Sequence, residues 1–199
     1  MTAQQQGRRL YVCRHGERMD FVFNVNDSNW VMRAFESGDY KRFNINMPQV
    51  LPKRPDMYLA WSSDSPLTEI GYLQAKLIGN ALMEANIKFH HVYASPAYRC
   101  VQTATGILKG MNDSSKSIVK MDPSLYEWTG FAKGSRVVLP KFFNSEQMAK
   151  ATQFPVDTAY KAFMNLDQIK MQEPLEDYYK RSHEFVVNML KSVKAKGGL

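Results

Sequence analysis

The stretch Leu10-Tyr11-Val12-Cys13-Arg14-His15-Gly16-Glu17 decides how the rest of the chain is interpreted. Its first four residues are apolar, which predicts a short buried strand with polar residues at its carboxyl end. Open α/β sheets place their chemistry at this end of a strand. His15 stands between Arg14 and Arg18, and nearby cations lower the pKa of an imidazole. A neutral histidine among arginines predicts a nucleophile that attacks a bound phosphoryl group.

A second junction between a strand and a helix carries another arginine. His91–Ala94 is strand-like and Ser95-Pro96 follows it, which predicts a helix with Ser95 as N-cap and Pro96 as its first residue. Arg99 then lies in the first helical turn, where a helix N-terminus favours an anion. The two junctions together predict a site for a dianionic phosphate ester.

Helices and strands elsewhere complete the expected framework. Thr68 is expected to cap a helix that supports the site, and Leu175–Lys196 predicts a long helix that ends at Gly197-Gly198. The apolar stripe expected to be buried on the first of these helices consists of Ile70, Leu73, Leu77 and Ala81.

Strands are expected near Leu10, Val92 and Val119, with helices between them. This order predicts an α/β fold with a mostly parallel sheet flanked by helices. The third strand, within Ser117–Met121, leads toward Glu127.

Two long connections interrupt this pattern. Residues 20–65 are longer than the usual connection in a compact domain, which predicts a lid-like insertion with a short helix at Trp30–Phe35 that Gly38 ends. The aromatic residues Phe43, Tyr58 and Trp61 either line a pocket for an aromatic group or cover the core. Residues 130–173 form a second insertion with a helix at Ser145–Thr152, capped by Ser145, and no chemistry is assigned to it.

The order and spacing of these motifs resemble the histidine phosphatase (phosphoglycerate mutase-like) superfamily. The longer agreement is similar to the branch that contains the phosphatase domain of the Sts proteins and ecdysteroid-phosphate phosphatase. It runs through Cys13–Asp20, Asn46–Pro48, Arg99–Ala104 and Leu125–Thr129, and the resemblance covers residues 8–199.

The resemblance implies a role for each candidate site residue. His15 would be the nucleophile that becomes phosphohistidine, and Glu127 would donate a proton to the leaving oxygen. The phosphoryl oxygens would be held by Arg14, Arg18 and Arg99. The implied activity is hydrolysis of a phosphomonoester, with phosphotyrosine or an aryl or steroid phosphate as the substrate class.

The chain departs from the family at its carboxyl end. Family members carry a second catalytic histidine on a late strand, but all four histidines here, His15, His90, His91 and His183, lie upstream of that point. We therefore expect a single domain over residues 1–199 that lacks the late strand, either truncated or naturally short. Its activity would be weak, and its exposed sheet edge would favour a homodimer. The alternative is a catalytically impaired pseudophosphatase that binds phosphate or acts as a scaffold.

Other enzyme classes fit less well. A cysteine-dependent tyrosine phosphatase wraps its phosphate in one longer loop, whereas only four residues separate Cys13 from Arg18. Mutases of the same superfamily carry a run that ends in Trp-Asn after the His-Gly pair, where this chain has Glu17–Asp20. No zinc or EF-hand ligand spacing occurs, so we expect neither a metal nor a cofactor, with arginines supplying the positive charge.

The composition limits the kinds of partner that the chain is expected to bind. With 199 residues, 44% hydrophobic and 23% charged, the chain is long enough to bury one core. The absence of a signal-like segment and of any long apolar run predicts a cytoplasmic protein that binds no membrane. The net charge of +7 is spread along the chain rather than gathered with aromatic residues, which argues against nucleic acid and favours attraction of phosphorylated substrates.

Overall fold

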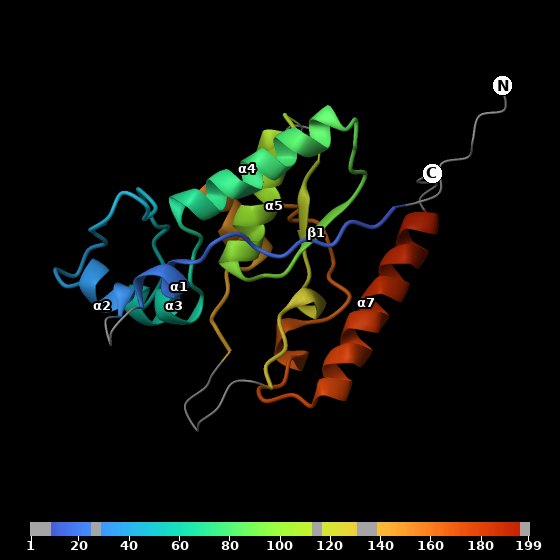
Figure 1. Cartoon of the computed structure of the whole chain (residues 1–199). Coiled ribbons are helices and arrows are strands. Elements are labelled where there is room, and N and C mark those ends of the chain that lie inside the picture. Colours follow the sequence, from blue (N-terminus) through green and yellow to red (C-terminus); the bar gives the residue numbers. More distant parts are fainter. Residues whose placement is uncertain (1–8, 25–28, 113–116, 131–138, 196–199) are drawn as a thin grey trace.

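The computed structural model describes residues 9–24, 29–112, 117–130 and 139–195 (Figure 1). At its centre, strands β1 (Val92–Ala94) and β2 (Val119–Met121) pair in parallel, with Val92 opposite Val119. Helix α5 (Tyr98–Gly110) connects the two strands. The expected strands near Val92 and Val119 and the parallel α/β character are confirmed.

Helix α4 (Glu69–Glu84) packs closely along α5. Thr68 caps α4 as expected, because its hydroxyl accepts the Gly71 N–H at 2.9 Å. The expected buried stripe is wrong, since its members Ile70, Leu73 and Leu77 are 48 to 56% exposed. The buried face consists instead of the small residues Gly71, Ala75 and Gly79.

Small residues face α5 because the two backbones approach too closely for larger side chains. A Cβ on Gly79 would collide with the carbonyl oxygen of Ile107, and one on Gly110 would collide with that of Lys76. This close packing fixes the position of α5, whose first turn carries Arg99.

Helix α7 (Leu175–Ala195) lies on the other side of β1 from α4 and α5 (Figure 1). The ring of Phe185 packs at 5.5 Å from that of Tyr93 on β1. His183 is exposed on this helix. The predicted long helix is confirmed, while its expected stop at Gly197-Gly198 lies outside the described residues.

The segment between His15 and α4 folds into three short helices, α1 (Met19–Phe23), α2 (Trp30–Ala34) and α3 (Met57–Ser63). The helix expected at Trp30–Phe35 is confirmed, and Gly38 follows it with a positive φ of 87°. Of the aromatic residues considered for a pocket, Trp61 is completely buried and packs at 4.9 Å from the Tyr98 ring. Trp61 is therefore a core residue.

The remaining elements are the 3₁₀ turns η1 (Pro123–Leu125) and η2 (Leu166–Gln168) and helix α6 (Ser145–Thr152). Helix α6 matches the predicted bounds, but Asn144 rather than Ser145 is its cap, because the Asn144 side chain accepts the Gln147 N–H. In the described ranges, no helix is both long and apolar enough to cross a membrane.

The strand expected at Leu10–Cys13 is wrong. This segment joins neither β1 nor β2, and Leu10 and Val12 are 60% and 87% exposed. An apolar run becomes a strand only where a neighbour in register satisfies its N–H and C=O groups. No element among the described residues pairs with this segment, so its apolar character alone does not make it a strand.

Candidate active site

His15 is held at the junction of α4 and α5. The N–H of Gly16 donates to the Thr103 hydroxyl on α5 at 3.2 Å, and the N–H of Glu17 donates to the Gln74 side chain on α4 at 3.2 Å. Gly16 is required here, because a Cβ would collide with the backbone of Gly71. The backbone on the carboxyl side of His15 is thus fixed by both helices.

Glu17 has a structural role that the sequence did not indicate. Its carboxylate accepts hydrogen bonds from the Thr68 hydroxyl at 2.7 Å and from the Asn46 side chain at 3.0 Å. Its carbonyl accepts the Thr68 N–H at 3.0 Å. Glu17 therefore ties the His15 loop to the cap of α4.

The hydrogen bond of the His15 ring determines its tautomer. Nδ1 lies 2.8 Å from the Gly16 carbonyl oxygen, and a carbonyl only accepts, so Nδ1 carries the proton. Partial burial, followed by the charges of Arg99, Arg18 and Arg14, lowers the pKa of His15 below its ordinary 6.5. Nε2 is therefore a free lone pair at neutral pH, as a nucleophile requires.

Arg99 lies in the first turn of α5, as expected, but the capping residue is different. The helix begins at Tyr98 rather than at Pro96, and the Ser95 hydroxyl accepts the Ala97 N–H, which precedes the helix. The Tyr98 N–H donates instead to Asp64 at 2.9 Å. Asp64, which directly follows α3, thus supplies the acceptor that a local cap would provide.

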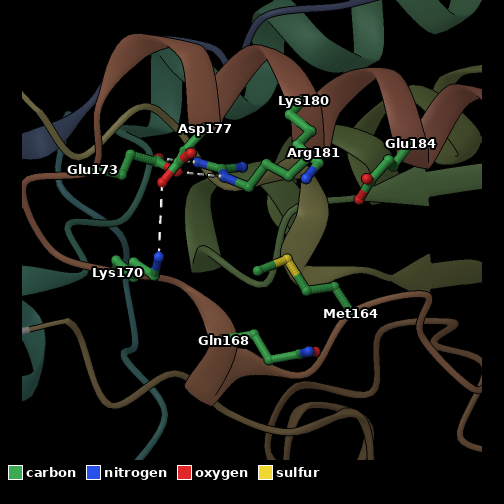
Figure 2. A pocket seen from close by; sticks show the side chains of 8 residues that line it. All are labelled: Met164, Gln168, Lys170, Glu173, Asp177, Lys180, Arg181 and Glu184. Carbon is green, nitrogen blue, oxygen red and sulfur yellow. Dashed lines mark hydrogen bonds and ion pairs between the residues drawn. The ribbon is translucent and has the colours of Figure 1, made fainter.

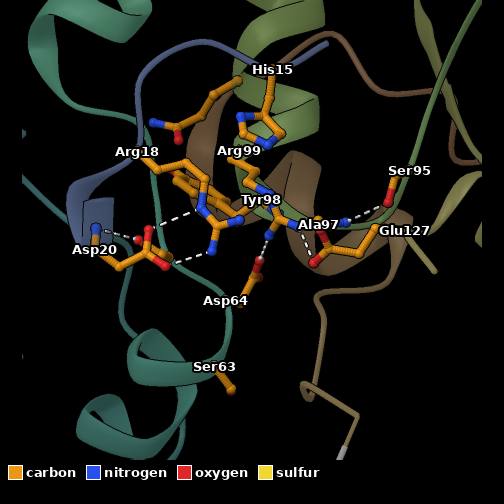
Figure 3. A network of polar contacts seen from close by, with 12 residues as sticks. His15, Arg18, Asp20, Ser63, Asp64, Ser95, Ala97, Tyr98, Arg99 and Glu127 are labelled. Atoms are coloured by element: carbon orange, nitrogen blue, oxygen red, sulfur yellow. Dashed lines mark hydrogen bonds and ion pairs between the residues drawn. The ribbon is translucent and has the colours of Figure 1, made fainter. Parts of the chain in front are cut away.

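Arg99 is 2% exposed, and its guanidinium lies between two carboxylates. One nitrogen is 2.7 Å from Glu127 and another is 4.0 Å from Asp64 (Figure 3). Its Nε is buried and makes no hydrogen bond to the described residues. Because a buried donor without a partner is costly, Arg99 retains hydrogen-bonding capacity for an anion.

Arg18 lies near His15 and Arg99 in the same network (Figure 3). Asp20 orients it by accepting two hydrogen bonds, the one from Nε measuring 2.9 Å. Its guanidinium also stacks 4.3 Å from the centre of the Phe21 ring. Arg14 differs from the others because it is exposed, although its charge acts on His15.

A buried ion pair between Arg54 and Asp64 supports the site. Arg54 is 6% exposed and pairs with the fully buried Asp64 at 2.8 Å. Its guanidinium lies 3.9 Å from the Trp61 ring centre and 4.1 Å from that of Phe143. The sequence carries no signal for this pair, because both residues stand in a proline-rich segment without periodicity.

The charge of the site comes from arginine side chains. Within the described ranges, no cluster of His, Cys, Asp and Glu could hold a metal ion. Cys100 adjoins Arg99, but burial raises the pKa of its thiol to about 11, so it is not a thiolate nucleophile at neutral pH.

The structure thus brings together four of the five predicted site residues, His15, Arg18, Arg99 and Glu127, in one network (Figure 3). Arg14 acts on this network through its charge. An electron-rich imidazole nitrogen, two guanidinium groups and a carboxyl group form an arrangement suited to phosphoryl transfer.

Comparison with known proteins agrees with this geometry. The family model of the histidine phosphatase superfamily (branch 1) matches residues 54–196. The chain is 36% identical over 192 residues to the ecdysteroid-phosphate phosphatase of Drosophila melanogaster, covering 95% of this chain and 24% of that protein. It is 39% identical over 193 residues to human ubiquitin-associated and SH3 domain-containing protein B, covering 96% of this chain and 29% of that protein.

A solved structure supports the fold. The crystal structure of the ecdysone phosphate phosphatase from Bombyx mori in complex with tungstate superimposes with a TM-score of 0.81 at 31% identity, covering 92% of this chain and 67% of that one. The chain spans less than a third of the length of the two curated relatives above. The family match and these identities show that the chain belongs to the histidine phosphatase superfamily.

Proposed function

We propose that this chain hydrolyses phosphomonoesters through a phosphohistidine intermediate on His15. The observation that carries the proposal is the state of the His15 ring: Nδ1–H is held by the Gly16 carbonyl, and partial burial together with three arginine charges favours the neutral form. Nε2 attacks phosphorus, so an N–P bond forms as the P–O bond to the leaving group breaks. Water then attacks phosphorus, the N–P bond breaks, and phosphate leaves.

The arginines stabilise the charge on the phosphoryl group during both steps. Arg99 is the strongest contributor, because a buried guanidinium is little screened by solvent. Arg18, fixed by Asp20, and the exposed Arg14 add further charge.

Glu127 exchanges a proton with the leaving oxygen and with the attacking water. In the structure its carboxylate pairs with Arg99 at 2.7 Å, where a phosphoryl oxygen would bind. The general acid is the carboxyl form of Glu127, which gives its proton to the leaving oxygen as the P–O bond breaks. The proton given to the leaving oxygen returns when water attacks the phosphohistidine.

The favoured substrates carry an apolar ring, as in phosphotyrosine or an aryl or steroid phosphate. Phe21 is 64% exposed directly beside Arg18, where it offers a surface for such a group. The names of the Drosophila and Bombyx relatives, which are steroid-phosphate phosphatases, agree with this class.

A second candidate is phosphate binding with little or no turnover. It is favoured because the network contains one histidine: His91 lies beside Lys120 in another cavity, and His90 and His183 are exposed. A site with fewer donors to the transition state turns over more slowly, because one such donor is worth roughly 100- to 1,000-fold in rate. A domain of this kind would keep its affinity for oxyanions.

The test compares p-nitrophenyl phosphate hydrolysis and tungstate binding in wild type, His15→Ala and the matched control His183→Ala. We expect turnover in wild type and control that His15→Ala abolishes. Tungstate binding without turnover in any variant would support the second candidate. Equal turnover in His15→Ala and wild type would refute the proposed nucleophile.

A further inference from the structure

Glu127 lies on a segment that neither a helix nor a strand holds in place. Residues 126–129 follow the η1 turn in an irregular conformation. A proton donor must lie within hydrogen-bond reach of its acceptor, and a displacement of about 1 Å costs roughly 100-fold in rate. Some other part of the fold must therefore fix this segment.

Arg181 on α7 contacts the backbone of this segment and of the η1 turn at three positions. Its Nη1 donates to the carbonyl oxygens of Ser124 at 2.8 Å and Tyr126 at 2.7 Å, and its Nη2 donates to that of Glu127 at 3.1 Å. Arg181 is only 7% exposed. One side chain thus satisfies three carbonyl groups that no strand pairs with.

Glu173 holds Arg181 in this orientation. Its carboxylate accepts from Arg181 Nε at 2.9 Å and from Nη2, in the two-point geometry that fixes a guanidinium plane. The same carboxylate accepts the Thr129 N–H at 3.3 Å, and the Glu173 carbonyl accepts the Trp128 indole N–H at 2.9 Å. Arg181 and Glu173 therefore both form hydrogen bonds with the Glu127 segment and hold it in place.

Figure 2 shows Arg181 and Glu173 side by side at one wall of a cavity of about 190 Å³. Lys180, Asp177 and Glu184 lie on the same helix around it. Besides this polar contact, α7 makes an apolar one with β1, where the Phe185 ring packs against that of Tyr93. A buried ion pair is a costly way to join two segments, which points to a role beyond packing.

We propose that Arg181, oriented by Glu173, is a positioning residue that sets the place of the Glu127 carboxyl in the reaction. The inference rests on the proposed function, in which Glu127 is the proton donor. In the free protein, Arg99 holds the Glu127 side chain and Arg181 holds its backbone. When substrate engages Arg99, the backbone anchor is what remains, so α7 governs protonation of the leaving group.

The test uses Arg181→Lys, which keeps the charge opposite Glu173 but loses the planar fork that reaches three carbonyls. The matched control is Lys180→Met, the exposed neighbour that lines the same cavity. Rates are measured for p-nitrophenyl phosphate, whose leaving group needs little protonation, and for an alkyl phosphate, whose leaving group needs it most. Tungstate affinity reports the arginine clamp independently.

We expect Arg181→Lys to lower the alkyl phosphate rate by about 10- to 100-fold more than the p-nitrophenyl phosphate rate, with tungstate affinity at or above that of wild type. Addition of Glu127→Gln to Arg181→Lys should change the ratio of the two rates no further than Glu127→Gln does alone, since both act through one carboxyl. Lys180→Met should behave as wild type.

Equal losses for the two substrates, or losses that multiply in the double variant, would overturn the inference. Amide hydrogen exchange of residues 124–129 adds a readout that does not need turnover: protection should fall in Arg181→Lys, and unchanged protection would also overturn it. Absence of phosphatase activity in wild type would instead refute the proposed function, so the two failures are distinguishable.

Discussion

Replacement of Arg99 by methionine should weaken oxyanion binding strongly and in a way that salt does not reverse. Arg99 is 2% exposed, and its Nε is buried without a partner among the described residues. A charge-assisted hydrogen bond of this kind contributes about 1.5–3 kcal/mol. Since about 1.4 kcal/mol corresponds to tenfold in affinity, tungstate should bind roughly 10- to 150-fold more weakly. Release of Glu127 from its ion pair acts in the same direction, because a free carboxylate repels the anion.

The matched comparison is Arg14→Met, which removes the same charge from an exposed position. Exposed ion pairs contribute about 0–1 kcal/mol, so the loss should be at most about fivefold. Isothermal titration calorimetry with tungstate at about 0.1 M and 1 M salt distinguishes the effects of the two substitutions, because the screening length falls from about 10 Å to 3 Å. The Arg14 difference should vanish at high salt while the Arg99 difference persists. Equal effects of the two substitutions, or none for Arg99, would refute the assignment of Arg99 as the buried anion clamp.

Three further predictions concern the nucleophile, the proton donor and the support of the site. In an NMR titration, His15 should show a pKa below 6.5, and Arg18→Met should raise it, because removal of a cation favours the protonated ring; a wild-type value at or above 6.5 would contradict the neutral nucleophile. Glu127→Gln should slow alkyl phosphates more than p-nitrophenyl phosphate, whereas a uniform loss would make Glu127 structural. Asp64→Asn leaves the buried Arg54 charge unpaired, which costs about 3–5 kcal/mol and should lower Tm by roughly 6–20 °C; an unchanged melting temperature in calorimetry would show that the pair does not support the fold.

Elements with local signals could be predicted from the sequence. Thr68 caps α4 through its own side chain, and the long pattern of α7 and the β-branched residues of β1 and β2 lie within single segments. The family could also be predicted, because His15 and Arg99 stand beside motifs whose order identifies it.

Features that depend on distant partners could not be predicted from the sequence. The Leu10–Cys13 segment has the composition of a strand, but a strand exists only beside a neighbour in register. The expected stripe of α4 assumed that large apolar residues are buried, whereas the backbone of α5 comes so close at Gly79 that no side chain fits there. The cap of α5 comes from Asp64, 34 positions earlier in the chain, beyond the reach of any local pattern.

Buried charges were the least predictable part of the site. Arg54, Glu173 and Arg181 look like ordinary surface residues in the sequence, because charged side chains are rarely buried unless paired. Their burial follows from three segments meeting around Arg99 and Glu127. Pairing across such distances along the chain is set by the fold and produces no periodic pattern in the sequence.

The central claim is that the phosphoryl group of the substrate is transferred to His15 during the reaction. The most direct measurement is rapid mixing with an aryl phosphate, followed by an alkaline quench and peptide mass spectrometry, since phosphohistidine survives base but not acid. We predict one phosphoryl group on the peptide that contains His15, lost on acid treatment and absent in His15→Ala. A phosphoryl group on another residue, or turnover with no phosphorylated peptide at any mixing time, would contradict the account.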